Sequence, residues 1–155
     1  MATDFQNNEV IDQLKTVLKD KGMKYTEQRA VILEIITQIN GHLNAEEIHG
    51  VVKNKYPQYN IGIATVYRTL NFLEEADLIS SISFGTEGKK YEGNQKTHHD
   101  HLICTQCGLI IEFVDPLIEQ QQDVIAKENK FKITGHTMQL YGLCPACDST
   151  NKGDK

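Results

Sequence analysis

The chain has no tryptophan, only three prolines and no long apolar run, and the last of these shortages decides whether a membrane-spanning helix is expected. A membrane-spanning helix needs about 18 consecutive apolar residues, and no stretch of the 155 residues approaches that length. The first ten residues show neither a cationic start nor an apolar stretch. No secretory signal is therefore predicted, and we expect a cytoplasmic protein. With 39% hydrophobic and 24% charged residues, the composition is typical of a folded chain and not of a disordered one.

Sequence motifs of several common enzyme classes are also missing. The chain has no GxSxG nucleophile motif, no P-loop and no HExxH motif, so we expect a protein that is not an enzyme. A metal-dependent hydrolase that uses the histidine-rich segment described below is the alternative, because open zinc sites in enzymes use similar ligands.

The overall charge is acidic, but one segment is basic. The net charge of −5 argues by itself against nucleic-acid binding. Between Lys15 and Arg29, however, five cations stand against two acids. A small basic patch of this kind can bind DNA although the whole chain is acidic.

The first half of the chain has the pattern of a winged helix-turn-helix domain. Apolar spacing and capping residues predict four helices, over about 10–21, from 26 onward, over 44–56 and over 63–76. In the fourth, Ile63, Val66, Leu70 and Leu73 share one stripe and are expected to face the core. Two strands, 78–84 and 89–92, follow around a turn at 85–88. A generic helical domain with a surface hairpin is the alternative.

The second half has a different character. Residues 93–97 are predicted to be a hinge between a domain at 1–92 and one at 98–155. Strands are expected near 101–103 and 109–114, a helix from Asp115 to about 129, and strand-like stretches at 131–134 and 137–143. The fold class is therefore α+β, with a small second domain ordered ββαββ or ββαβ. So small a unit buries little core alone, which suggests pairing with a second copy.

The four cysteines form two closely spaced pairs. Cys104 and Cys107 are separated by two residues, as are Cys144 and Cys147. Two such turns can supply the four thiolates of a structural Zn²⁺ site, and disulfides are rare in the cytoplasm. A redox dithiol is the alternative, but a thioredoxin-like motif needs one pair beside a βαβ unit.

Residues 98–101 read His-His-Asp-His. In an extended chain, His98 and Asp100 point to one face and His99 and His101 to the other. One strand could thus supply two metal sites with ligands that suit borderline divalent ions. From the residues alone the outlying ligands stay open; His42, Glu92, Glu112, Glu119 and His136 are candidates, and each has an ordinary structural role as its alternative.

Together these motifs resemble the ferric uptake regulator family of metal-responsive bacterial repressors. The segments that carry the resemblance are 22–29 (GMKYTEQR), 63–70 (IATVYRTL), 98–104 (HHDHLIC), 107–108 (CG), 110–113 (IIEF) and 140–144 (LYGLC). The resemblance covers about Val10 to Cys147. It implies a winged-helix DNA-binding domain followed by a dimerisation domain.

The resemblance also implies three groups of metal ligands. It assigns structural zinc to Cys104, Cys107, Cys144 and Cys147. It implies a regulatory site between the domains at His42, Glu92, His99, His101 and Glu112, and an additional site at His98, Asp100, Glu119 and His136. The face alternation of residues 98–101 agrees with this division.

The implied function is repression of iron-uptake genes by a homodimer, or a tetramer, that binds duplex DNA and no membrane. The helix at 63–76 would enter the major groove of A·T-rich inverted repeats. The residues expected to contact DNA are Lys24, Arg29, Ala64, Thr65, Tyr67 and Arg68. Peroxide-sensing relatives tend to have aspartate where this chain has Glu92 and Glu112, so Fe²⁺ is favoured as the regulatory ion, with Mn²⁺ or Zn²⁺ as substitutes. Zinc-, manganese- and peroxide-sensing members of the family stay alternatives.

Overall fold

The computed structural model describes residues 8–39, 41–83, 88–94 and 97–148. They belong to two compact units, Met1–Gln95 (unit 1) and Lys96–Lys155 (unit 2). Residues 85–87 of the expected turn, and 95 and 96 of the expected hinge, lie outside the described residues. Each unit is considered by itself below.

Unit 1 begins with the four expected helices, with one short addition. They are α1 (Asn8–Asp20), α2 (Glu27–Gln38), α3 (Ala45–Lys55) and α4 (Ile63–Glu75), and a 3₁₀ turn, η1 (Pro57–Tyr59), precedes α4. Two predicted caps are confirmed. The Thr26 side chain accepts a hydrogen bond from the Arg29 amide, and Asn44 and Glu47 form a reciprocal capping box. Such caps satisfy amides that the first helical turn leaves without partners.

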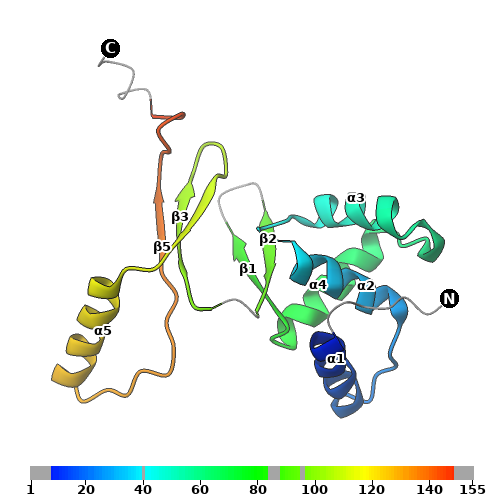
Figure 1. Ribbon diagram of the computed structural model, residues 1–155, viewed down its shortest axis with the longest axis horizontal. Helices are drawn as coiled ribbons and strands as arrows, with labels where there is room; N and C mark the ends of the chain where they lie inside the picture. Colours follow the sequence, from blue (N-terminus) through cyan, green and yellow to red (C-terminus); the bar gives the residue numbers. More distant parts are fainter. Residues whose placement is uncertain (1–7, 40, 84–87, 95–96, 149–155) are drawn as a thin grey trace. The chain divides into compact units, whose positions relative to one another are not determined.

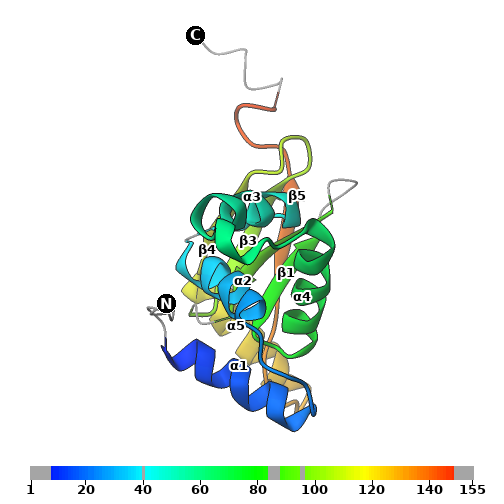
Figure 2. The ribbon, with the colours of Figure 1, turned by 90° about the vertical axis from the view of Figure 1, so that its right-hand side faces the viewer.

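Helix α2 is the centre of unit 1. Figures 1 and 2 show it among α1, α3 and α4, and it packs against all three. Seven consecutive residues, 30–36, are buried. A helix surrounded on several sides buries more than one stripe, which explains why its apolar residues do not follow the spacing of a surface helix.

A hairpin completes unit 1. Strands β1 (Ile79–Ser83) and β2 (Lys89–Gly93) pair antiparallel, with Ile79 opposite Gly93. The segment before α3 joins this hairpin, because Leu43 and Tyr91 exchange backbone hydrogen bonds of 3.1 and 2.8 Å. Four helices followed by this hairpin confirm the predicted winged-helix layout.

Unit 2 has the order ββαβ, the second of the two expected orders. Strand β3 (Asp100–Cys104) lies between β4 (Ile110–Phe113), which runs antiparallel, and β5 (Gln139–Gly142), which runs parallel to it. Helix α5 (Pro116–Glu128) connects β4 to β5 through an irregular return segment. Asp115 caps α5 by accepting from the amides of Leu117 and Ile118.

Two local expectations are wrong. Residues 131–134 alternate in polarity but form no strand, because alternation describes the two faces of an extended chain and does not by itself provide a strand to pair with. Ile63 does not face the core: its side chain is 37% exposed, whereas Val66, Leu70 and Leu73 are fully buried. As the first residue of α4, Ile63 precedes the point at which the helix reaches the core.

Unit 2 leaves much apolar surface uncovered. Among its described residues the buried hydrophobic ones are Ile103, Cys104 and Ala126, whereas Leu117 and Phe131 are 74% and 76% exposed. An apolar hollow of about 190 Å³ lies over the sheet; its lining includes Leu102, Ile111 and Leu140. Within the described part of the chain, no helix combines the length and apolarity that crossing a bilayer requires.

Candidate metal centres and nucleic-acid interface

The sheet of unit 2 gathers possible metal ligands at both of its ends. Because β3 and β5 are parallel, both finish at one end, where Cys104 and Cys144 stand. Their starting residues share the opposite end, close to Asp100 and His136. Strand β4 runs back towards that opposite end, so the first turn of α5, with Glu119, lies there as well. Topology alone therefore separates two donor groups along one sheet.

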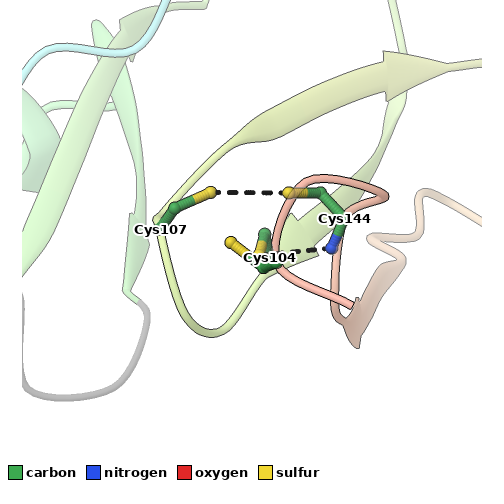
Figure 3. Close-up of side chains that lie close together, drawn as sticks. Cys104, Cys107 and Cys144 are labelled. Atoms are coloured by element: carbon green, nitrogen blue, oxygen red, sulfur yellow. Dashed lines mark hydrogen bonds between the residues drawn. The ribbon is translucent and has the colours of Figure 1, made fainter. Parts of the chain in front are cut away.

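At the first end, four sulfur atoms converge. Those of Cys104, Cys107, Cys144 and Cys147 all lie within 4.8 Å of one another. Figure 3 shows the Cys107 and Cys144 sulfurs facing each other, 3.7 Å apart. A tetrahedral zinc site with Zn–S bonds of about 2.3 Å has sulfurs about 3.8 Å apart. The spacing of this pair therefore fits zinc.

Backbone hydrogen bonds and neighbouring thiols shift the pKa values of two of the cysteines in opposite directions. Hydrogen bonds from the backbone of Cys107 and Cys144 lower the pKa of Cys104 to about 6. Hydrogen bonding to Cys144 and Cys107 raises the pKa of Cys147 to about 12. Four adjacent thiols cannot all ionise without a cation among them, and thiolate is the ligand that zinc favours. Four protein ligands fill a tetrahedral shell, so this cluster fits a structural zinc site.

At the other end of the sheet, two imidazoles and two carboxylates face one another. Nε2 of His98 lies 3.5 Å from Asp100 Oδ1 and 3.6 Å from Glu119 Oε1. Nε2 of His136 lies 3.6 and 3.3 Å from the same two oxygens. A tetrahedral ion with bonds of about 2.0–2.1 Å holds its ligands about 3.4 Å apart. These four contacts have that spacing.

The same group contains buried polar atoms without hydrogen bonds. Asp100 is fully buried, and among the described residues no hydrogen bond reaches either of its carboxylate oxygens, Glu119 Oε1 or His136 Nε2. Buried polar atoms are normally hydrogen-bonded, because leaving one without a partner costs about 1–3 kcal/mol or more. The donor set therefore fits a divalent cation that all four side chains would coordinate.

The remaining expected ligands form two partial sets, one in each unit. In unit 1, His42 Nε2 lies 3.2 Å from Glu92 Oε2. In unit 2, the His99 and His101 rings lie 4.8 Å apart, and His99 Nε2 lies 3.8 Å from Glu112 Oε1.

The orientation of His99 suits a ligand. Its Nδ1 lies 2.8 Å from the Thr97 carbonyl oxygen. Donation from Nδ1 to that carbonyl leaves Nε2 as the acceptor nitrogen, an arrangement typical of metal-binding imidazoles. The predicted alternation of residues 98–101 is also confirmed, since His98 and Asp100 belong to one group and His99 and His101 to another.

The expected DNA-contacting residues all lie in unit 1. A groove of about 370 Å³ between α2 and α4 is lined by Thr26, Gln28, Arg29, Thr65, Arg68 and Thr69. No acidic residue lines it. Arg68 Nη2 donates to Thr65 Oγ1 at 3.2 Å, and Arg29 Nη1 donates to the Lys24 carbonyl at 2.7 Å. Ala64 and Tyr67 are exposed on α4.

Two residues that contact these side chains were not found from the sequence. Glu46 accepts a hydrogen bond of 2.6 Å from the Tyr67 hydroxyl, and the Phe72 ring lies 5.3 Å from the Arg29 guanidinium. Both contacts join separate helices. Sequence spacing within one helix therefore carries no signal for either.

Comparison with known proteins agrees with this architecture. The sequence profile described as "Ferric uptake regulator family" matches residues 20–141. The ferric uptake regulation protein of Campylobacter jejuni is 52% identical over 140 residues, which cover 90% of this chain and 89% of that protein. The corresponding protein of Legionella pneumophila is 43% identical over 84% of this chain and 95% of its own length.

A solved structure gives the same result. The ferric uptake regulator of Helicobacter pylori, described as having three functional metal-binding sites, superposes with a TM-score of 0.82 at 36% identity. The match covers 92% of this chain and 93% of that one. A family of regulators does not favour the hydrolase alternative. The chain belongs to the ferric uptake regulator family of metal-responsive transcriptional regulators.

Proposed function

We propose that this chain is a cytoplasmic, homodimeric repressor of iron-uptake genes. It has no catalytic activity and binds A·T-rich inverted repeats when Fe²⁺ is bound. The observation that carries the proposal is the division of metal ligands between the two units, since His42 and Glu92 belong to the unit with the winged helix. His99, His101 and Glu112 belong to the other.

Neither partial set fills a coordination shell of four or more ligands by itself. We therefore assign all five residues to one regulatory site that takes ligands from both units. A divalent cation bound there would supply the positive charge that allows these carboxylates and imidazoles to converge. His42 and Glu92 then tie the winged helix to unit 2. In a dimer, that connection sets the spacing of two recognition helices, and half-sites about one DNA turn apart require a defined spacing.

The other two groups have separate roles in this proposal. Cys104, Cys107, Cys144 and Cys147 hold structural Zn²⁺. His98, Asp100, Glu119 and His136 form an additional site, which lies wholly within unit 2. Since it takes no ligand from the winged helix, its effect on DNA binding is indirect, through the shape and stability of unit 2.

Helix α4 is the proposed recognition helix. Arg29, Arg68 and Thr65 line the groove beside it and have the chemistry to bind phosphate or a guanine edge. The Lys24 carbonyl accepts a hydrogen bond from Arg29, and the Lys24 ammonium is the proposed contact to the DNA backbone or an A·T-rich minor groove. Ala64 and Tyr67 offer apolar surface to a thymine methyl group.

The uncovered apolar surface of unit 2 supports the proposed homodimer. Side chains such as Leu117 and Phe131 are about three-quarters exposed, and large exposed apolar patches mark interaction surfaces. A second copy would cover them and supply the second recognition helix that an inverted repeat requires.

Iron is proposed because the similar curated proteins are named for ferric uptake regulation. Ligand type alone does not select Fe²⁺. Solved relatives include a Francisella tularensis regulator with iron, a Pseudomonas aeruginosa regulator with manganese and a zinc-bound manganese uptake regulator. Mn²⁺ and Zn²⁺ are therefore the ions to compare.

The test is anaerobic fluorescence anisotropy with a labelled duplex that carries an A·T-rich inverted repeat. Protein that retains its cysteine-bound zinc is titrated with Fe²⁺, Mn²⁺ or Zn²⁺. We expect Fe²⁺ to raise affinity at concentrations where added Zn²⁺ has no effect. Activation by Zn²⁺ alone would assign a zinc sensor, and binding that no ion changes would reject the shared site.

Two variants locate the interaction. Arg68→Ala should lower the affinity of the Fe²⁺-loaded protein by about tenfold or more, the scale of one lost arginine contact. Lys53→Ala is the matched control, because it removes a positive charge from the last turn of α3 in the same unit. Equal effects of the two variants would reject the assignment of α4.

A further inference from the structure

The hydroxyl of the exposed tyrosine on the recognition helix is already engaged. Tyr67 is 43% exposed, yet its hydroxyl donates a 2.6 Å hydrogen bond to Glu46 Oε1 in the first turn of α3. A phenol bound to a carboxylate at this distance makes a charge-assisted hydrogen bond, which is stronger than a neutral one. The contact raises the pKa of Tyr67 and lowers the pKa of Glu46.

Capping of α3 does not explain Glu46. The capping box uses Asn44 and Glu47, which satisfy each other's backbone amides at 2.8 Å. An acidic side chain in the first turn is favoured by the helix dipole, but the dipole does not require it to reach α4. Glu46 does so across 21 positions of sequence.

The support beneath Glu46 is well fixed. The capping box orders the start of α3, and backbone hydrogen bonds between Leu43 and Tyr91 attach the preceding segment to β2. A side chain on so constrained a turn holds its partner more firmly than one on a free loop would. The Tyr67 ring therefore has a defined direction before DNA arrives.

We propose that Glu46 is a positioning residue for DNA sequence reading, which holds Tyr67 so that its ring, and not its hydroxyl, meets the DNA. This inference rests on the proposed DNA-binding function. A free phenol can donate to a phosphate at any sequence, and such contacts carry no sequence information. A ring whose hydroxyl is donated elsewhere offers apolar surface, which distinguishes bases that carry a methyl group from those that do not.

Glu46 also places a negative charge beside α4. It repels the phosphates of every duplex alike, whereas the favourable ring contact forms only at the correct base. The pair should therefore lower affinity for random DNA more than affinity for the operator. The quantity to measure is therefore the ratio of operator affinity to affinity for random DNA.

The experiment compares the affinity of the metal-loaded protein for the A·T-rich inverted repeat with its affinity for a random duplex of equal length. Glu46→Ala should reduce the ratio by about tenfold, the scale of one lost base contact. Glu46→Gln should keep most of the ratio, because its amide oxygen still accepts from Tyr67. In a Tyr67→Phe background, Glu46→Ala should not change the ratio any further, since the hydrogen bond is already absent and the lost charge affects both duplexes alike.

Glu27→Ala is the matched control, because Glu27 is an acidic residue in the first turn of α2 and removal of its charge tests the general effect of an acid on this unit. The melting temperature of each variant shows whether the fold is intact. An unchanged ratio in Glu46→Ala would overturn the inference, as would an equal loss in Glu27→Ala or an undiminished loss in the Tyr67→Phe background. Failure of the wild-type protein to bind DNA would instead reject the proposed function itself.

Discussion

Removal of zinc from the four-cysteine cluster is expected to unfold unit 2 while unit 1 stays folded. Unit 2 has little core of its own, with Ile103, Cys104 and Ala126 as the buried hydrophobic residues of its described part. Unit 1 instead has an extended core built around α2. The stability of unit 2 should therefore depend on the connection that the cysteines make between β3 and β5.

The size of the effect follows from the length of the loop that the cluster closes. Cys107 and Cys144 are 37 positions apart. A cross-link that closes a loop of this length lowers the entropy of the unfolded chain and so stabilises the folded state by about 4 kcal/mol. Whole domains are stable by about 5–15 kcal/mol. For a unit of about 60 residues, a loss of about 4 kcal/mol lowers the melting temperature by roughly 30 °C.

Hydrogen exchange read by peptide mass spectrometry resolves the two units. After a chelator has removed zinc, confirmed by elemental analysis, the amides of β3 and β5 should exchange rapidly while those of α2 stay protected. Added zinc should restore protection, which is the control for irreversible damage. Protection of β3 and β5 that persists in verified zinc-free protein would refute the argument that the cysteine cluster stabilises unit 2.

Three smaller perturbations test other parts of the molecule. Asn44→Ala removes the cap of α3 and should lower the free energy of unfolding by about 1 kcal/mol in urea denaturation; an unchanged midpoint would contradict the capping box. Asp100→Asn should eliminate metal binding at the additional site while the zinc content stays constant, as elemental analysis would show; an unchanged metal-to-protein ratio would exclude Asp100 as a ligand. Burial raises the pKa of Glu74, but hydrogen bonds from Lys89 and Ser81 outweigh it and hold the pKa below its usual value. A lowered carboxyl pKa stabilises the fold at pH values above the unfolded pKa of 4.5, and this stabilisation disappears as the pH falls through the folded pKa. At neutral pH, the free energy of unfolding of Lys89→Ala should therefore be lower than that of the wild type by less than about 1 kcal/mol. The two curves of stability against pH should converge in acid, and a gap that persists there would refute the assignment.

Features that depend on local chemistry could be predicted from the sequence. Thr26 and Asn44 begin helices because their side chains bond amides three residues away, which any reader of the sequence can locate. The alternating faces of residues 98–101 follow from the geometry of an extended chain and divide the histidines correctly. The cysteine cluster followed from the spacing within each pair.

Features that depend on distant partners could not be predicted. The alternation at 131–134 has the strand pattern, but a strand also needs a neighbouring strand to pair with, and the sequence does not reveal that β5, and not this segment, pairs with β3. The contact between Glu46 and Tyr67 depends on how α3 packs against α4. The position of Ile63 depends on where the core begins beneath α4, which spacing alone leaves undetermined.

The two donor groups of unit 2 also explain how so short a parallel pairing can have a defined register. Strands β3 and β5 pair over four residues only, His101–Cys104 with Gln139–Gly142. A slip by one residue would shift β5 by about 3.3 Å and turn each of its side chains to the opposite face. Cys144 would then leave the sulfur cluster, and His136 would leave Asp100 at the other end. Because one register alone completes both donor sets, the ligands at the two ends specify the sheet on which they stand.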